Sequence, residues 1–453
     1  MKKIEEIPTE ENILKTMSEN ILNRNKDIIY FYKLLEAQEG NCTIAIDGRW
    51  GSGKTFFVRQ AKMMINALNP LSGMNDETRT EIIDSLGISK DGLHENSSVA
   101  VYYDAWENDN DTKPVFSLIY EITKQLSIDF SLSDISVVRI ASSIINAIKG
   151  YNIEGIVEAL KSDNPFKQFK EEKSVDEKIQ EFFSEILKER GNRLVIFIDE
   201  LDRCKPTYAV ELLEQLKHYI TDHRITVVFS VNITQLQHTI ERYYGMNFDS
   251  CRYLDRFFDI RISLPDADLG VFYNKMGVNS QYYIDDVMKK LVAMFNFELR
   301  EMTRFCSQVK AAIYEPTHNS SKYDFSFSDG KGRIFILIYI VPLLIGLKIA
   351  DISKYNSFIN GENSDPLREL LHRTEHENIM SSMLNGNESF EDEEGKTLVT
   401  YDEIADRIYE AIFIKQYDKL LYSTEIGQYE FKKSSRALAL RVASLMSDYA
   451  DLN

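Results

Sequence analysis

The sequence predicts an α/β protein, a three-layer sandwich with a mostly parallel sheet, a helical insertion and a C-terminal helical region. Three observations support this prediction. Short, β-branched apolar runs are nearly continuous rather than alternating, which is typical of strands buried on both faces. Helical periodicity fills the stretches between these runs. Beyond Pro265 no further strand series is evident, and the periodicity is mainly helical.

The elements are expected in the following order. One or two amphipathic helices over residues 10–37 precede the first strand. The expected strands are Cys42–Ile46, Val99–Tyr103, Leu194–Ile198, Ile225–Val231 and Phe257–Leu264. The expected C-terminal helices lie within residues 281–313, 333–352, 366–384 and 401–421.

The stretch between the second and third strands is far longer than one crossover helix requires. We therefore predict four parts. Residues 1–107 hold the N-terminal helices and the first part of the sheet domain, and residues 108–192 form the helical insertion. Residues 193–266 complete the sheet domain, and residues 267–453 form the C-terminal helical region.

Length and composition indicate an acidic, folded protein of about two or three domains. The 453 residues are 43% hydrophobic and 27% charged, which excludes wholesale disorder and a collagen-like structure. The net charge is −18, from 53 Lys and Arg against 71 Asp and Glu. Because this charge repels a polyphosphate backbone and no basic block is present, nucleic acid is an unfavourable partner.

The sequence gives no sign of export, of a metal framework or of a membrane span. The four cysteines form no C-x-x-C pair, and the N-terminus is acidic where a signal peptide needs an apolar stretch. The apolar window Ile334–Leu347 has 14 residues and contains Pro342, whereas a span needs about 18–20. A second window, Ile135–Ile148, is interrupted by Arg139 and Asn146. We expect packed helices in a cytoplasmic protein without a transmembrane segment.

The segment GRWGSGKT, Gly48 to Thr55, directly follows an expected strand and directly precedes an expected helix. It fits G-x-x-x-x-G-K-[ST], whose glycines let backbone N–H groups surround phosphates beside a helix N-terminus. Lys54 is expected to reach the β- and γ-phosphates, and the Thr55 hydroxyl to bind Mg²⁺. The expected nucleotide-binding residues are Gly48, Arg49, Trp50, Gly51, Ser52, Gly53, Lys54, Thr55 and Phe56.

The segment RLVIFIDELDRC carries a buried strand into two consecutive carboxylates. Asp199 is placed to hold Mg²⁺, and Glu200 to act as general base or to orient the attacking water. Capping of the following helix is the alternative role for either acid. Arg203 is expected to form a salt bridge to a nearby acid, with contact to nucleotide or a neighbour as the alternative.

Asn232 ends the fourth strand, in FSVNITQL. Its amide is a candidate for sensing the γ-phosphate or the attacking water, and we count it with Lys54 and Glu200 as a catalytic candidate. An ordinary helix N-cap is the alternative, and the two roles are compatible.

The segments GRWGSGKT, VYYDAWEND, FIDELDRC and YLDRFFDIRISLP resemble the KAP family of P-loop NTPases, over about residues 25–310. The family is placed in the additional-strand catalytic-glutamate class, related to AAA+ and STAND ATPases. The resemblance implies one further strand between the strands that carry the phosphate and Mg²⁺ motifs. The family usually has two aspartates in its second motif, where this chain has Asp199 and Glu200. Trp106 belongs to a hallmark near the active face, although a buried tryptophan anchoring the strand edge explains it equally well.

The segment FELREMTRF resembles the helical region in which family members carry an arginine that approaches the nucleotide. Arg300 and Arg304 are therefore candidates, as is Arg256, with a solvated or structural arginine as the alternative. One further pattern, LHRTEHE, fits the H-x-x-E-H arrangement of zinc proteases through His372 and His376. Because no third ligand is apparent, we expect a solvated helix there.

These residues predict Mg²⁺-dependent hydrolysis of a nucleoside triphosphate, and the family likeness favours ATP. Hydrolysis would act as a conformational switch on a protein partner or effector encoded nearby, and a nucleotide-dependent homo-oligomer is open. The resemblance also suggests bacterial antiphage defence, by analogy alone. The alternatives are a nucleotide-binding signalling scaffold with little hydrolysis and a nucleic-acid-stimulated motor.

Overall fold

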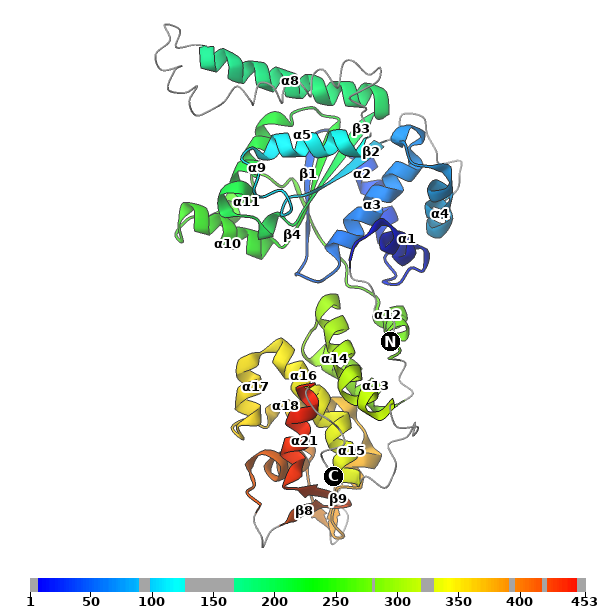
Figure 1. The fold of residues 1–453 in the computed structure, drawn as a ribbon, viewed down its shortest axis with the longest axis vertical. Helices are drawn as coiled ribbons and strands as arrows, with labels where there is room; N and C mark the ends of the chain where they lie inside the picture. The colour runs from blue at the N-terminus through cyan, green and yellow to red at the C-terminus, as the bar shows by residue number, and fades with distance from the viewer. Residues whose placement is uncertain are drawn as a thin grey trace. The chain divides into compact units, whose positions relative to one another are not determined.

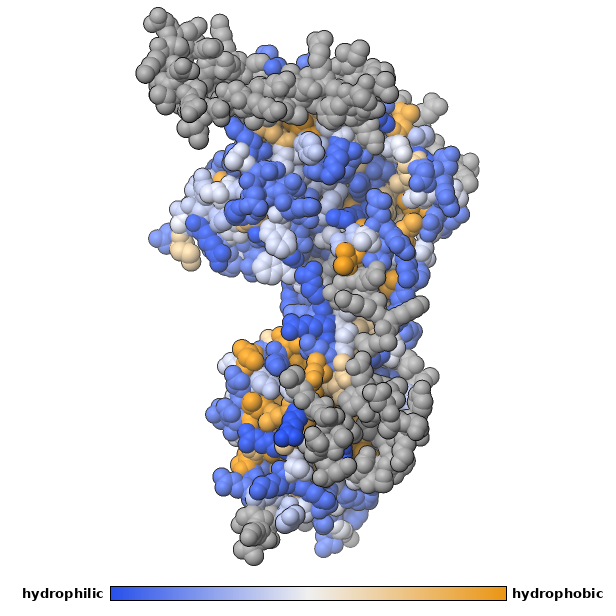
Figure 2. Space-filling view, viewed as in Figure 1, coloured by the Kyte–Doolittle hydropathy of each residue, from blue (hydrophilic) through white to orange (hydrophobic). Residues whose placement is uncertain are grey.

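The computed structural model describes residues 7–88, 98–126, 167–278, 282–318, 330–390, 396–417 and 422–445. The chain divides into two compact units, Glu5–Leu269 and Gly270–Asn453. The first unit contains the main sheet, and the second is mainly helical (Figure 1). The described surface of the sheet unit seen in Figure 2 is largely hydrophilic.

The main sheet has five strands in the order β2-β3-β4-β1-β5, and every neighbouring pair is parallel. Its strands are β1 (Cys42–Asp47), β2 (Ser98–Asp104), β3 (Arg193–Asp199), β4 (Ile225–Val231) and β5 (Ile260–Ser263). Strand β4 lies between β1, which leads into the glycine-rich loop, and β3, which ends at Asp199. The additional strand implied by the family resemblance is therefore confirmed.

Both faces of the sheet are covered by helices, so the expected three-layer sandwich is also confirmed. One face packs on α1 (Glu10–Ser18), α2 (Asn25–Glu36), α3 (Lys54–Leu68) and α4 (Asp76–Leu86). The other packs on α5 (Pro114–Gln125), α8 (Lys167–Arg190), α9 (Pro206–Tyr219), α10 (Ile233–Tyr244) and α11 (Ser250–Leu254).

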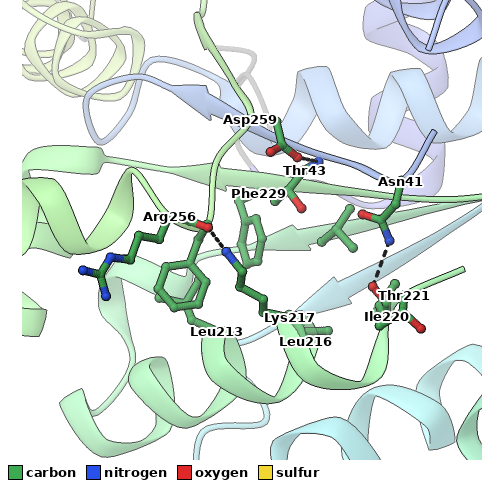
Figure 3. A pocket seen from close by; sticks show the side chains of 12 residues that line it. Asn41, Thr43, Leu213, Leu216, Lys217, Ile220, Thr221, Phe229, Arg256 and Asp259 are labelled. Atoms are coloured by element: carbon green, nitrogen blue, oxygen red, sulfur yellow. Dashed lines mark hydrogen bonds between the residues drawn. The ribbon is translucent and has the colours of Figure 1, made fainter. Parts of the chain in front are cut away.

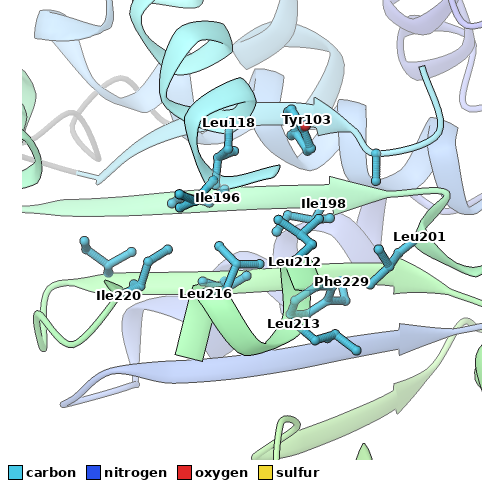
Figure 4. Close-up of a cluster of buried hydrophobic side chains, with 14 of the residues drawn as sticks. Tyr103, Leu118, Ile196, Ile198, Leu201, Leu212, Leu213, Leu216, Ile220 and Phe229 are labelled. Carbon is cyan, nitrogen blue, oxygen red and sulfur yellow. The ribbon is translucent and has the colours of Figure 1, made fainter. Parts of the chain in front are cut away.

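Alternation along the strands builds the two cores. On β3, Ile196 and Ile198 face the α5 and α9 side, whereas Val195 and Phe197 face the α3 side. All four side chains are fully buried, which explains why the sequence pattern is continuous rather than alternating. Figure 4 shows the core on the α5 and α9 side, where Leu212 and Leu216 of α9 lie among Ile196, Ile198 and Phe229.

The described ends of the 108–192 stretch belong to the sandwich. Helix α5 contacts β2 and α9, and Phe182 and Phe183 of α8 are buried in the same core. Residues 127–166, including the window Ile135–Ile148, lie outside the described residues.

The second unit is built mainly from helices. They are α12 (Leu269–Lys275), α13 (Tyr283–Met294), α14 (Leu299–His318), α15 (Lys331–Phe335), α16 (Val341–Ala350), α17 (Ile352–Ile359), α18 (Asp365–Thr374), α19 (Glu377–Ser381), α20 (Tyr401–Tyr409) and α21 (Ser434–Ala443). π-Helical turns at Ile336–Ile340 and Glu410–Ile414 extend α15 and α20.

We expected no further strand series beyond Pro265, but the second unit contains two short two-stranded sheets. Strands β6 (Glu388–Ser389) and β7 (Thr397–Leu398) pair, as do β8 (Ser423–Ile426) and β9 (Tyr429–Lys432). Each strand has at most four residues, which is too short for a readable period. The β8–β9 turn contains Gly427 at a φ of 54°.

Residues Lys331–Ala350 form one apolar helix of 20 residues, long and apolar enough to cross a membrane by length and composition. The helix is therefore longer than the 14-residue window in the sequence indicated. The helix continues past Pro342, which follows the π-helical turn. However, 67% of its apolar window is buried, against α13, α14 and α21. This is the environment of a core helix.

Candidate nucleotide site

The glycine-rich loop joins β1 to α3 at the carboxyl edge of the sheet. Gly51 and Gly53 have φ values of 88° and 92°, a left-handed conformation that strains any residue with a Cβ. At Gly48 a Cβ would lie 2.9 Å from Ser52 Oγ and 3.3 Å from Lys54 Cγ. The Gly48 amide also donates to the Val231 carbonyl of β4 at 3.2 Å. The glycines therefore provide both the turns and the space of a tight loop.

Lys54 begins α3 and is buried. Its ammonium donates to the carbonyl oxygens of Gly48, at 2.5 Å, and Arg49, at 3.1 Å. Burial lowers the pKa of Lys54, and the nearby carboxylates Asp202, Asp199 and Glu200 oppose that effect. The side chain thus curls over the loop toward a group of acids.

Asp199 ends β3 and is 1% exposed. Its Oδ2 accepts a hydrogen bond from the Tyr102 hydroxyl at 3.0 Å, and its Oδ1 accepts one from the Glu200 amide at 3.0 Å. These two donors fix the plane of the carboxylate. The Tyr102 ring is in turn covered by the Arg59 guanidinium, 4.2 Å from the ring centre.

Glu200 has a φ of 61°, in the left-handed region, which is uncommon for a residue with a side chain. This conformation turns the chain out of β3 and into a 3₁₀ turn, Leu201–Arg203. Burial, and secondarily the Asp199 carboxylate, raise the pKa of Glu200 to about 7. Strain and a perturbed pKa at one residue are typical of a functional position.

The Glu200 carboxylate is paired with Arg203, whose Nε lies 2.5 Å from Oε2. The Arg203 guanidinium lies 5.7 Å from the ring centre of Trp50 and 5.5 Å from that of Trp106. Trp50 Nε1 also donates to Asp202 Oδ2 at 2.5 Å. The predicted salt bridge of Arg203 is therefore present. The alternative of a buried Trp106 is wrong, because this residue is 52% exposed. It contacts Arg203 from the turn after β2.

Asn232 directly follows β4, and its side chain caps α10 by accepting from the Gln235 amide at 3.2 Å. The N-cap role is thus present, while the catalytic role stays a prediction. Asp47, at the end of β1, accepts from the Ile233 amide at 2.9 Å. Because the strands are parallel, the ends of β1, β3 and β4 bring these groups to one edge, the usual ligand-binding edge of such a sheet.

The residues fit a phosphate-bearing ligand with Mg²⁺. Among the described residues, buried polar atoms without a hydrogen-bond partner include Ser52 Oγ, Asp202 Oδ1 and Ser230 Oγ. Ser52 lies in the loop, Asp202 follows β3, and Ser230 pairs in register with Asp199. An unpaired buried polar atom is costly. Phosphate oxygens and metal-bound water would supply partners, beside the acids and hydroxyls that Mg²⁺ prefers.

The remaining expected loop residues lie around this edge. Thr55 and Phe56 follow Lys54 in the first turn of α3 and are partly buried, whereas Arg49 is exposed. One residue that sequence reasoning missed is Arg24, which is 5% exposed. It donates to the Ser52 carbonyl at 2.9 Å and to the Pro265 carbonyl at 2.6 Å. No local motif marks it, because both partners are distant in sequence.

The three arginine candidates have exposed side chains. Arg256 is exposed in the segment before β5, and Arg300 and Arg304 are exposed on α14 of the second unit. Their catalytic roles stay predictions.

The two histidines of LHRTEHE pair with different groups. His372 Nε2 lies 2.9 Å from Asp402 Oδ1. His376 lies 3.1 Å from Asp286 Oδ2 and 2.5 Å from the Tyr339 hydroxyl. The solvated helix expected here is wrong for His376, whose side chain is 13% exposed. It faces α13 and the π-helical turn rather than His372.

A separate cavity of about 310 Å³ lies at the amino ends of β1 and β4 (Figure 3). Its floor is apolar, and three of its polar side chains bond to backbone groups. Asp259 accepts from the Thr43 amide at 2.8 Å, Asn41 donates to the Ile220 carbonyl at 2.8 Å, and Lys217 donates to the Arg256 carbonyl. The lining residues are Asn41, Thr43, Leu213, Leu216, Lys217, Ile220, Thr221, Val227, Phe229, Arg256, Phe257 and Asp259.

A glycine-rich loop after β1, carboxylates after β3 and one strand between them define a P-loop NTPase fold of the additional-strand class. The chain belongs to the KAP family, whose P-loop domain matches residues 24–324. No curated protein matches the chain. Among solved structures, it is similar to the ORC2 protein of Aeropyrum pernix in ADPNP–ADP complexes, at 12% identity and a TM-score of 0.27. That match covers 91% of this chain and 96% of the other.

Proposed function

We propose that this protein is a Mg²⁺-dependent ATPase of the KAP type, in which hydrolysis drives a conformational switch that acts on a partner. One observation carries the proposal: the strained, half-buried Glu200 lies beside Asp199 and within electrostatic range of Lys54. The choice of ATP over GTP rests on family likeness.

Binding would use the loop and Lys54. The ammonium now bonds to the Gly48 and Arg49 carbonyls, and these bonds would be exchanged for phosphate oxygens. The N–H groups of Gly51, Gly53 and the first turn of α3 would surround the same oxygens. Arg24 supports the loop from behind through the Ser52 carbonyl.

Mg²⁺ bound to the phosphates would neutralise charge on the transferring group. Thr55 and Asp199 are the residues that would hold it. Asp199 is prepared for this role because Tyr102 and the Glu200 amide already fix its carboxylate. Unlike Glu200, Asp199 is almost fully buried, so its charge is screened little by water.

Glu200 would accept a proton from the attacking water. A carboxyl group with a pKa of about 7 is a stronger base than an ordinary glutamate and is still partly ionised near neutral pH. The Asn232 Oδ1 is used by the helix cap, which leaves its amide NH₂ to orient the water or the γ-phosphate.

The test is phosphate release from the full chain with ATP·Mg²⁺ and GTP·Mg²⁺. We expect Lys54→Ala to lose binding and turnover, and Glu200→Gln to keep binding while turnover falls about a hundredfold or more. Lys124→Ala and Glu121→Gln remove the same groups from an exposed pair on α5 and should match the wild type. Undiminished turnover in Glu200→Gln would exclude Glu200 as the base.

A nucleotide-binding signalling scaffold is the second candidate, because Arg203 holds the Glu200 carboxylate in an ion pair and hydrolysis would wait until this pair rearranges. In that case Glu200→Gln would keep the biological output. If both turnover and output are lost, hydrolysis is the mechanism.

The setting is also a proposal. We place the protein in the cytoplasm, with a protein partner or effector encoded nearby and a nucleotide-dependent homo-oligomer in which Arg256, Arg300 or Arg304 approaches a nucleotide. Bacterial antiphage defence is proposed by analogy with the family alone. Mass measurement with and without ATP·Mg²⁺ tests the oligomer.

A further inference from the structure

The chain has two tryptophans, and both lie against Arg203. Trp50 is carried by the glycine-rich loop, Trp106 by the turn after β2, and Arg203 by the 3₁₀ turn after β3. The indoles are 45% and 52% exposed, so neither serves as a core residue. Large exposed aromatic side chains that share one arginine call for another explanation.

The loop and the 3₁₀ turn are joined twice through Trp50. Its Nε1 donates to Asp202 at 2.5 Å, and its ring lies beside the Arg203 guanidinium. Asp202 and Arg203 are adjacent in the turn, so both links act on the same short segment. A shift of the loop therefore changes the surroundings of Arg203 directly.

The turn is joined in the same way to Glu200. The Arg203 Nε lies 2.5 Å from Glu200 Oε2, and the two side chains are 21% and 18% exposed. An ion pair of this kind is weak when its long side chains move freely. Here the contacts with Trp50 and Trp106 restrict the guanidinium and favour a single arrangement.

We propose that Arg203 is a positioning residue that couples the phosphate-binding loop to Glu200, with Trp50 as the link to the loop and Trp106 as a second aromatic support. Trp50, Arg203 and Trp106 form what we term the indole–arginine cluster. The inference deepens the proposed function and rests on it, since Glu200 is there the base.

The coupling follows from the contacts of the loop. When Lys54 exchanges the Gly48 and Arg49 carbonyls for phosphate oxygens, the two peptide groups that directly precede Trp50 lose their present partner. Trp50 then moves relative to Asp202 and Arg203. Arg203 responds by changing its hold on Glu200, which sets where that carboxylate points.

The first measurement uses the full chain labelled with 5-fluorotryptophan, whose ¹⁹F spectrum has one resonance for each tryptophan. The Trp50→Phe and Trp106→Phe spectra assign them. The probes are ADP·Mg²⁺ and the β,γ-imido analogue of ATP with Mg²⁺. Trp106 lies outside the loop, so under this proposal its response to nucleotide passes through Arg203.

We expect both resonances to shift with the ATP analogue in the wild type. In Arg203→Ala the Trp50 resonance should still shift, and the Trp106 shift should be lost. Arg252→Ala, which removes an arginine from an exposed i,i+3 pair with Asp249, should behave as the wild type. A Trp106 shift that persists in Arg203→Ala, or is absent in the wild type, overturns the coupling.

The second measurement is steady-state turnover. Arg203→Ala should lower kcat about tenfold to a hundredfold, because a misplaced base is inefficient, with KM for ATP within about twofold of the wild type. Arg203→Lys should recover part of kcat, since it keeps the charge without the planar group. Trp106→Ala, at an exposed position, serves if Arg203→Ala does not fold, and Trp106→Phe should lose less kcat than Trp106→Ala because it keeps an aromatic ring. An unchanged kcat in Arg203→Ala and Trp106→Ala overturns the proposal.

The two hypotheses fail in different ways. Glu200-dependent turnover with a Trp106 response that ignores Arg203 keeps the ATPase and removes the coupling. Nucleotide binding without turnover, with a Trp106 response that requires Arg203, removes the ATPase and keeps the coupling.

Discussion

The two edges of the main sheet are made by the same strands and the same cores, yet they differ in how their polar groups are treated. At the carboxyl edge, Ser52 Oγ, Asp202 Oδ1 and Ser230 Oγ are buried without partners, and Glu200 holds a left-handed conformation. At the amino edge, the cavity residues Asn41, Asp259 and Lys217 are hydrogen-bonded to backbone groups. Buried polar atoms without hydrogen-bond partners, rather than the shape of a cavity, thus distinguish the candidate ligand-binding edge.

The comparison has one exception. Thr226 Oγ1, near the amino end of β4, is also buried without a partner among the described residues. It is a single neutral hydroxyl within a strand, whereas the carboxyl edge combines hydroxyls with the acids Asp199, Glu200 and Asp202. Substitutions at matched positions can separate the effect of one isolated unpaired hydroxyl from the effect of unpaired hydroxyls that lie beside acids.

The largest expected effect comes from neutralising one aspartate at each edge. Asp199→Asn should lower ATP turnover about a hundredfold or more, because the metal site loses a charge worth several kcal/mol of stabilisation. Asp259→Asn should leave turnover unchanged, since an amide oxygen can still accept from the Thr43 amide. Phosphate release across a Mg²⁺ titration measures both. Equal losses in the two variants would mean that the edges are not functionally distinct.

The second contrast uses two glutamates with the same backbone strain. Glu200 and Glu375 have φ values of 61° and 51°. Replacement of either by glycine should raise the free energy of unfolding by about 1 kcal/mol, because glycine adopts this conformation without strain. Only Glu200→Gly should lose turnover, which is the usual trade of stability against activity.

Chemical denaturation and phosphate release on the same samples decide this second contrast. A Glu200→Gly protein less stable than the wild type would show that the strained turn is held by contacts of the side chain. In that case the left-handed conformation of Glu200 would not lower the free energy of unfolding.

Much of this edge was predictable because its determinants are local. Gly48 to Thr55 and Asp199–Glu200 are contiguous in sequence, and each follows a continuous apolar run, so strand, turn and chemistry are read together. The fold class and the family followed from the same segments. The N-cap role of Asn232 was also foreseen as an alternative, since Asn at the end of a strand is a common helix start.

The contacts that were missed join distant segments. Arg24 bonds to Ser52 and Pro265, and Tyr102 bonds to Asp199. No spacing rule in the sequence predicts these contacts. Tryptophan is usually buried, which favours a buried anchor at Trp106. The contact that holds Trp106 at the surface comes from Arg203, 97 residues later in the sequence. Similarly, the length of the apolar window could not reveal the full helix Lys331–Ala350, because its ends are set by packing.

The smallest expected effect separates the two kinds of unpaired hydroxyl. Ser52→Ala and Thr226→Val each remove one buried hydroxyl without a partner and should leave the free energy of unfolding unchanged or raise it by up to about 1 kcal/mol. Ser52→Ala should also weaken nucleotide binding about twofold to tenfold, because the lost oxygen would have paired with the ligand. Thr226→Val should not change binding. Calorimetric titration with ADP·Mg²⁺ measures the affinity, and chemical denaturation measures the free energy of unfolding. Identical affinities in the two variants would show that the Ser52 hydroxyl contributes no more to nucleotide binding than that of Thr226.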